Sequence, residues 1–258
     1  MNTGSNNTAP QSLKRALDLF DLLAMNSPMS IVDISKALGV TRTTVYSLVA
    51  PLLATNYIEK DEATGKYRLG YKFFEIGRQY RHYYPFLPAL EAGAKKLSQK
   101  VDCKINGMVL KPKGVALIIA SIDMSQNTMP DIDCTVPVSV SACGKTLLSA
   151  LDDNELDEYI SNMSFVRLTD KSIMDADTLR AEIMQIRTNG YATEYGELFA
   201  FWGCIAAPIR SMGGKVVAAM SVTSTLERLQ RDRDYLLKEL LDTTTRISMV
   251  LGWNGYLN

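Results

Sequence analysis

The sequence predicts an α+β protein with an N-terminal winged helix-turn-helix domain, a linker helix and a C-terminal α/β domain. Two helical patterns joined by a glycine turn are followed at once by a hairpin pattern, which is the element order of a winged helix. In the second half, strands and helices alternate at irregular intervals, which favours an α+β sandwich over a doubly wound parallel sheet. Pro85 and Pro88 mark the boundary between the halves.

Length and composition agree with a globular protein of one large or two ordinary domains: 258 residues, 47% hydrophobic and 22% charged. No run approaches the roughly 18 apolar residues of a membrane span. The polar start lacks the apolar core of a signal peptide, so we expect residues 1–11 to be a disordered tail and the protein to be cytoplasmic. Four separated cysteines without a CxxC pair predict reduced thiols, with no disulfide, metal site or cofactor.

A first helix is predicted from about Ser12 to Asn26, before the break at Pro28. Ser30 can cap a second helix, in which Ile31, Ile34, Ala37 and Leu38 form one apolar face, and Gly39 can end it in the left-handed conformation. The inward side chains predicted for the first helix are Leu13, Ala16, Leu17, Phe20, Leu23 and Ala24.

The third helix is capped by Thr41 and exposes short hydrogen-bonding side chains in its first turns, where a recognition helix contacts base edges. An ordinary αα-hairpin has the same division into polar and apolar faces, so this stretch alone leaves both interpretations open. Pro51 predicts a bent or shortened end beyond the contact surface. The predicted base-contacting residues are Thr41, Arg42, Thr43, Thr44, Tyr46 and Ser47, and the inward residues are Val45, Leu48, Val49 and Leu52.

Two extended runs at 57–59 and 66–69 flank a polar turn containing Gly65 and complete the winged helix at residues 12–70. Lys60, Lys66 and Arg68 on this hairpin are expected to contact phosphate. Ten Lys/Arg against seven Asp/Glu in residues 1–84, within a net charge of zero, predict modest affinity per subunit and a need for dimerisation.

Residues 71–84 predict an aromatic-rich linker helix that packs on a partner subunit, with DNA contact by Arg78 or Arg81 as the alternative. His82 is the only histidine and lies in this linker, so no Ser-His-Asp or Cys-His pair is expected and the protein is predicted not to be an enzyme. The remaining residues, 85–258, predict an effector-binding and oligomerisation domain. Its expected elements are helices at 87–100, 142–151, 175–189 and 226–251, a further helix opened by Asp152 or Asp153, and strands at 104–110, 115–122, 136–140, 191–194, 204–209 and 215–222.

This order of elements resembles the IclR family of bacterial transcriptional regulators from Ser12 to Gly252. The resemblance rests on several short motifs in a fixed order. They are SLKRALDLFDLL at 12–23, the helix-turn-helix, YRLG at 67–70, ACGKTLL at 142–148, IRxxGYA at 186–192, CIAAPI at 204–209 and GxVVAAxSV at 214–222.

The resemblance implies a curved antiparallel sheet (GAF/PAS-like), a small-molecule effector bound between sheet and helices, a double-stranded DNA operator as partner, and a homodimer or homotetramer. No membrane partner is implied. Carried over by position, the effector-binding residues are Val136, Ala142, Cys143, Gly144, Glu194, Trp202, Cys204, Ser221 and Thr223.

Elementary chemistry supports part of this set. Cys143 and Gly144 open a helix, whose unpaired N–H groups favour a carboxylate, and Ser221 and Thr223 share one strand face. Glu194 would repel an acid unless it is protonated or accepts a ligand hydroxyl. Trp202, beside Phe201, predicts either a small cavity or a stacking platform for an aromatic acid.

Three alternatives stay open. Cys143 at a helix N-terminus predicts a lowered pKa, which would suit redox sensing or, less well, catalysis. A regulator working by protein contact alone would need no effector. Gly144-Lys145-Thr146 is similar to the end of a phosphate-binding loop, but Ser139 replaces the first glycine, so Lys145 is expected to project from the helix surface.

Overall fold

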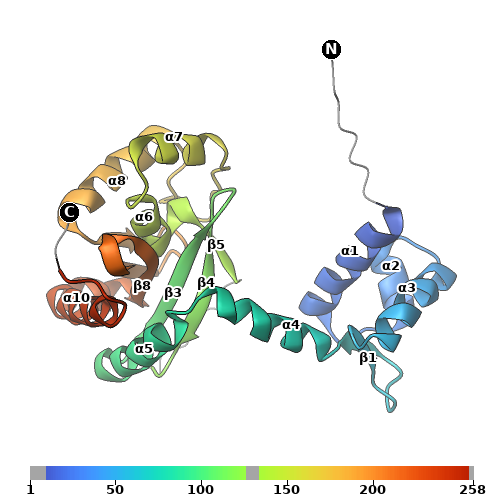
Figure 1. Cartoon of the computed structure of the whole chain (residues 1–258). Coiled ribbons are helices and arrows are strands. Elements are labelled where there is room, and N and C mark those ends of the chain that lie inside the picture. The colour runs from blue at the N-terminus through green and yellow to red at the C-terminus, as the bar shows by residue number, and fades with distance from the viewer. Residues whose placement is uncertain (1–9, 126–133, 256–258) are drawn as a thin grey trace. The chain divides into compact units, whose positions relative to one another are not determined.

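The computed structural model describes residues 10–125 and 134–255. The chain divides into two compact units, Met1–Pro85 and Phe86–Asn258 (Figure 1). The expected tail at 1–11 lies outside the described residues up to residue 9, and the expectation is wrong at its end, because Gln11 already begins the first helix.

The N-terminal unit consists of helices and one small hairpin. Its elements are α1 (Gln11–Asn26), α2 (Ile31–Leu38), α3 (Arg42–Ala54), β1 (Ile58–Lys60), β2 (Tyr67–Leu69), α4 (Lys72–Tyr80) and the 3-10 turn η1 (Arg81–Tyr83). One apolar core joins the three helices to the hairpin. Its buried residues are Leu19, Leu23, Ile31, Ile34, Val45, Val49, Ile58 and Tyr67.

Side-chain caps fix the turn between α2 and α3. Ser30 Oγ accepts the Asp33 N–H, Gly39 ends α2 with φ 63°, and Thr41 Oγ1 accepts the Thr44 N–H at the start of α3. The two helices meet at 110°. Among the described residues no single helix is long and apolar enough to cross a membrane, and only this bent pair reaches that length and apolarity together.

The inward face of α1 differs from the prediction. Leu13 and Leu17 are 52% and 53% exposed, whereas Leu19, which the pattern did not include, is fully buried with Leu23. Ala24, at the other end of the predicted face, is exposed too. Because the core of this unit contacts the stripe containing Leu19 and Leu23, the stripe containing Leu13 and Leu17 is left on the surface.

The hairpin is anchored at both ends. Asp61 caps the turn by accepting the N–H groups of Ala63 and Thr64, and Tyr67 pairs with Met29 in a bridge that adds a third extended segment. A Cβ on Gly70 would lie 2.2 Å from the Asn56 carbonyl oxygen, so the motif at 67–70 requires a glycine.

Contrary to the expectation of shortening, α3 continues past Pro51 to Ala54.

The C-terminal unit is built on one six-stranded antiparallel sheet in the order β5-β4-β3-β8-β7-β6 (Figure 1). The strands are β3 (Lys104–Lys111), β4 (Val115–Ile122), β5 (Thr135–Pro137), β6 (Ala192–Tyr195), β7 (Trp202–Arg210) and β8 (Val216–Thr225). The helices are α5 (Leu87–Val101), α6 (Ala142–Leu148), α7 (Asp153–Ser161), α8 (Ala176–Asn189), α9 (Leu226–Arg231) and α10 (Arg233–Val250), with 3-10 turns η2 (Val138–Val140) and η3 (Met212–Gly214).

Helices cover both faces of this sheet. The short helix α6 lies on one face and contacts β3, β6, β7 and β8, while α5 and α10 lie on the other (Figure 1). Side-chain contacts identify the faces along β3: Ser141, which caps α6, contacts Met108, whereas a Cβ on Gly107 would meet Leu90 of α5. We call the side that carries Met108 the α6 face.

Candidate DNA-binding and effector-binding sites

The first turns of α3 present a polar surface. Arg42, Thr43, Tyr46 and Ser47 are exposed, and Tyr46 keeps 57% of its accessible surface. Thr44 is half-buried, with its hydroxyl 2.9 Å from that of Thr41. The predicted set of six therefore divides into a pair that caps the helix and four side chains that project from it.

The three cations of the hairpin differ in their surroundings. Lys60 and Lys66 are exposed. Arg68 instead pairs with Glu59 at 3.0 Å across the two strands, and the other oxygen of Glu59 accepts the Tyr71 N–H. Since Glu59 neutralises Arg68, Lys60 and Lys66 are the hairpin cations available to phosphate, although Asp61 and Glu62 bring the net charge of the hairpin to zero. Arg68 and Glu59 instead brace the hairpin against the start of α4.

The predicted effector residues on the sheet converge on the α6 face. Thr223 on β8 pairs with Cys204 on β7, which in turn pairs with Glu194 on β6. Ser221 is two residues from Thr223 and therefore shares its face. Cys204 Sγ lies 3.2 Å from Thr223 Oγ1, so a row of small polar side chains crosses three strands.

Helix α6 places Cys143 above this row, but not as a reactive thiol. Cys143 is 1% exposed, and burial raises the pKa of its thiol to about 12, although a hydrogen bond with Ser221 lowers it. The predicted lowering of this pKa is wrong because desolvation of the thiolate outweighs the helix N-terminus. Burial likewise raises the pKa of the Cys204 thiol well above its ordinary value.

The neighbours of Cys143 have structural contacts. The Gly144 N–H donates to Ser141 Oγ and is not free for a ligand. A Cβ on Gly144 would lie 2.5 Å from the Val138 Cα, so this glycine allows α6 to pack closely on η2. Ala142 and Val136 are each 1% exposed in the same apolar cluster. These residues shape the wall of the site.

Glu194 is buried and already hydrogen-bonded. Its Oε1 accepts the N–H groups of Glu197 and Leu198. Burial raises the pKa of the Glu194 carboxyl above its ordinary value and outweighs these bonds. The raised pKa makes this carboxyl easier to protonate than an exposed glutamate, which reduces the expected repulsion of an acid.

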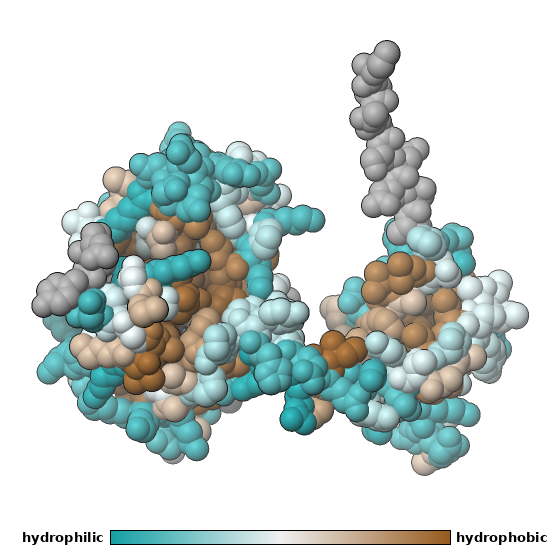
Figure 2. Space-filling model, viewed as in Figure 1, coloured by the Kyte–Doolittle hydropathy of each residue, from teal (hydrophilic) through white to brown (hydrophobic). Residues whose placement is uncertain are grey.

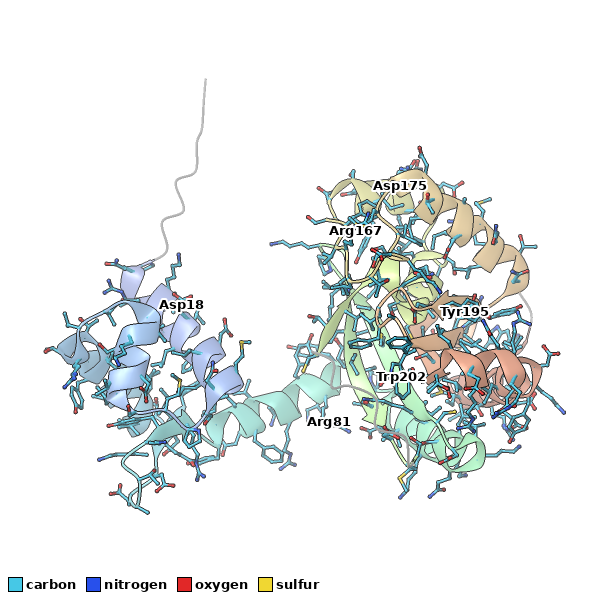
Figure 3. All side chains as sticks on the ribbon, turned by 180° about the vertical axis from the view of Figure 1, so that it is seen from behind. Asp18, Arg81, Arg167, Asp175, Tyr195 and Trp202 are labelled. Carbon is cyan, nitrogen blue, oxygen red and sulfur yellow. The ribbon has the colours of Figure 1, made fainter. Side chains whose placement is uncertain are left out.

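Trp202 begins β7 and is half-buried, on the same face as Cys204 (labelled in Figure 3). Phe201 is 80% exposed and forms no wall of the site. The bulk expected from the Trp202–Phe201 pair is therefore supplied by Trp202 alone.

Comparison with known proteins identifies the chain. The model of the bacterial transcriptional regulator IclR C-terminal domain matches residues 89–249, and that of the IclR helix-turn-helix domain matches residues 12–62. The chain belongs to the IclR family. The HTH-type transcriptional regulator XynR of Escherichia coli is 27% identical over 221 residues, which cover 85% of this chain and 88% of XynR.

Solved IclR structures share the whole fold. The Thermotoga maritima IclR structure matches with a TM-score of 0.81 at 20% identity, covering 94% of this chain and 99% of that one. An IclR homolog from Microbacterium hydrocarbonoxydans, complexed with 4-hydroxybenzoate, matches with a TM-score of 0.79 at 20% identity over 93% and 99%. These findings confirm the predicted family, the α+β class and the function of a DNA-binding transcriptional regulator.

The prediction for Lys145 on α6 of this IclR chain is wrong. Lys145 does not project from the surface; it is fully buried. Its Nζ lies 2.9 Å from Glu197 and 2.7 Å from Glu182. Burial lowers the pKa of the ammonium, but these two carboxylates outweigh it and raise that pKa. Lys145 is thus an internal tie between α6, α8 and the loop after β6.

The sequence reasoning missed two further residues near the site. Burial raises the pKa of the Glu197 carboxyl to about 7, although Lys145 lowers it. Lys104, at the start of β3, pairs in register with Thr223 and is only 9% exposed. A lysine in a strand covered on both faces was the available signal, because such a position normally carries an apolar residue.

Proposed function

We propose that this IclR-family regulator binds a small carboxylic acid on the α6 face and that binding changes its affinity for a double-stranded operator. The observation that carries the proposal is the meeting of Ser221, Thr223, Cys204 and Glu194 beneath Cys143. Hydroxyl and thiol groups at this spacing can orient the polar atoms of a small ligand. The 4-hydroxybenzoate complex of the Microbacterium homolog supports an acidic ligand.

The N-terminal unit supplies the DNA contacts in this proposal. Arg42, Thr43, Tyr46 and Ser47 read base edges from α3, and Lys60 and Lys66 bind phosphate. Thr41 and Thr44 preserve the helix start, and Arg68 has the lesser role of steadying the hairpin.

The regulator acts as a homodimer or homotetramer. Large apolar side chains of α1 and the linker, Leu13, Leu17, Phe74, Ile76 and Tyr83, are 46–76% exposed. Figure 2 shows apolar surface on the N-terminal unit. A second copy that covers these side chains would bury them and would double the number of DNA contacts. The four free cysteines suit a reducing cytoplasm.

The thiols of the site favour ligand binding over catalysis. The raised pKa values of the Cys143 and Cys204 thiols disfavour both a redox sensor and a cysteine enzyme. We therefore expect stoichiometric binding of an acid without turnover.

Fluorescence anisotropy with DNA fragments flanking the protein's own gene tests the DNA contacts. Arg42→Ala is expected to cost about 1–3 kcal/mol on the preferred fragment and little on random DNA. Lys66→Ala is expected to weaken both alike and to lower the salt slope by about one. Equal losses on both DNAs for both variants would contradict this assignment.

A further inference from the structure

The α6 face carries a lysine, Lys104, that is mostly buried and has no carboxylate partner among the described residues. Lys104, Asn106 and Met108 alternate along β3 on the side that carries Met108, which contacts Ser141 at the start of α6. Lys104 stands in register with Thr223, and the next pair on the same face is Asn106 with Ser221. The Lys104 side chain therefore starts from the same polar row as the candidate effector residues.

In the described part of the chain, Lys104 has no carboxylate within 4.0 Å of its Nζ. Candidate partners near it in sequence bond elsewhere. Asp102 lies by Arg228, and Asp123 accepts the N–H and hydroxyl of Ser125. The carbonyl oxygen of Cys103 accepts from Ser98.

A comparison within the unit shows how unusual this is. Lys145, the other lysine buried in the described residues, holds two carboxylates within 2.9 Å. A buried charge without a counter-ion is costly, so proteins pair it, neutralise it or use it. Lys104 is 9% exposed and no acid of the described chain reaches it, yet its Nζ is not among the buried atoms that lack a partner, so the ammonium keeps contact with solvent and an anionic ligand can pair with it.

Resting on the proposed effector site, we infer that Lys104 is the residue that binds the acid group of the effector. The ligand class is then a small organic carboxylate whose acid group pairs with Lys104 Nζ and whose body lies over Ser221 and Thr223. The Thr223 hydroxyl, adjacent in register, can donate to the same acid group.

This placement also keeps the acid group of the ligand away from the Glu194 carboxyl, which would repel it at close range. Lys104 is on β3 and Glu194 is on β6, three strand spacings away across β8 and β7. At about 4.8 Å per spacing, roughly 14 Å lies between their backbones. The acid group thus stays distant from Glu194, which is left to contact a hydroxyl or carbonyl at the other end of the ligand.

The first test needs no ligand. Lys104→Met keeps the length of the side chain and removes a charge that no described carboxylate pairs, so the melting temperature of the ligand-free full chain should not fall by more than about 1 °C. Lys95→Met, the same change at an exposed position of α5, should stay within about 1 °C of wild type. A larger fall for Lys104→Met would show that the lysine has a partner within the protein, and the inference would be wrong.

The second test uses pyruvate, benzoate and 4-hydroxybenzoate, each beside its neutral amide, with calorimetry on the full chain. At least one acid should bind wild type and Lys95→Met, its amide should not, and Lys104→Met should weaken binding at least about tenfold. Equal binding of acid and amide, no acid binding at all, or unchanged affinity in Lys104→Met would overturn the inference.

The role of Lys104 and the proposed function of the protein are contradicted by different results. If an acid changes DNA binding but Lys104→Met leaves its affinity unchanged, only the role of Lys104 is wrong. If the full chain binds no fragment of its own flanking DNA, the proposed function fails, while the melting temperatures and amide comparison still decide whether Lys104 binds an acid.

Discussion

Replacing Lys145 by Met should be among the most damaging conservative changes in this protein. The side chain is fully buried, and its ammonium joins Glu182, 37 residues away, and Glu197, 52 residues away. The Glu197 side chain is 11% exposed, whereas that of Glu182 is 36% exposed and can turn to water. The variant therefore leaves Glu197 buried without a cation.

The magnitude follows from that orphaned carboxylate. Breaking a buried ion pair by removing one partner costs about 3–5 kcal/mol. In a domain of this size each kcal/mol lowers the melting temperature by roughly 2–4 °C, so a loss of about 6–20 °C is expected at pH 8. At pH 5 the loss should be smaller, because Glu197, whose pKa is about 7 even beside Lys145, takes up a proton and loses its charge.

Thermal unfolding at pH 5 and pH 8 measures this effect, with Lys95→Met as the exposed control. Adding Glu197→Gln to Lys145→Met should recover part of the stability at pH 8, because the buried anion is then absent. If Lys145→Met behaved like the control, or lost as much stability at pH 5 as at pH 8, the buried tie would not contribute as described.

Two further predictions concern the pKa of Glu197 and the packing around Gly144, with Gly77 of the N-terminal unit as a control. A carboxyl whose pKa is raised in the folded state stabilises the fold below its unfolded pKa, and this contribution is lost as the pH rises through the folded pKa. The free energy of unfolding of wild type, measured in urea, should therefore fall between about pH 4.5 and 7. Glu197→Gln should flatten this fall. Gly144→Ala should destabilise by about 1–3 kcal/mol, since its Cβ would lie 2.5 Å from Val138. Gly77→Ala, a helical position with open space around it, should instead be neutral or stabilising; equal losses in the two glycine variants would refute the packing argument.

Local patterns predicted much of the N-terminal unit. Ser30 and Thr41 cap their helices and Gly39 ends α2, because capping depends on residues only three or four positions apart. The pattern failed for α1, where two apolar stripes exist. Only the packing of α2 and α3 decides that Leu19 is buried and Leu13 is not.

The chemistry of the effector site was harder to predict. The resemblance placed Ser221, Thr223 and Cys204 in one site, and the sheet register brings them together. The burial of Lys145 and the raised pKa of Cys143 depend on segments distant in sequence, which no local spacing reveals. Lys104 was passed over because a lysine in a strand usually projects to solvent.

The proposed regulation requires that an acid bound in the C-terminal unit change the affinity of the N-terminal unit for DNA. Anisotropy of the full chain on a fragment flanking its own gene, titrated with the acid that binds most tightly, tests this directly. The DNA affinity of wild type should shift on binding the acid, and this shift should disappear when Ser221→Ala and Thr223→Val remove the hydroxyl groups. DNA binding that is unchanged by saturating acid, despite measurable acid binding, would contradict it.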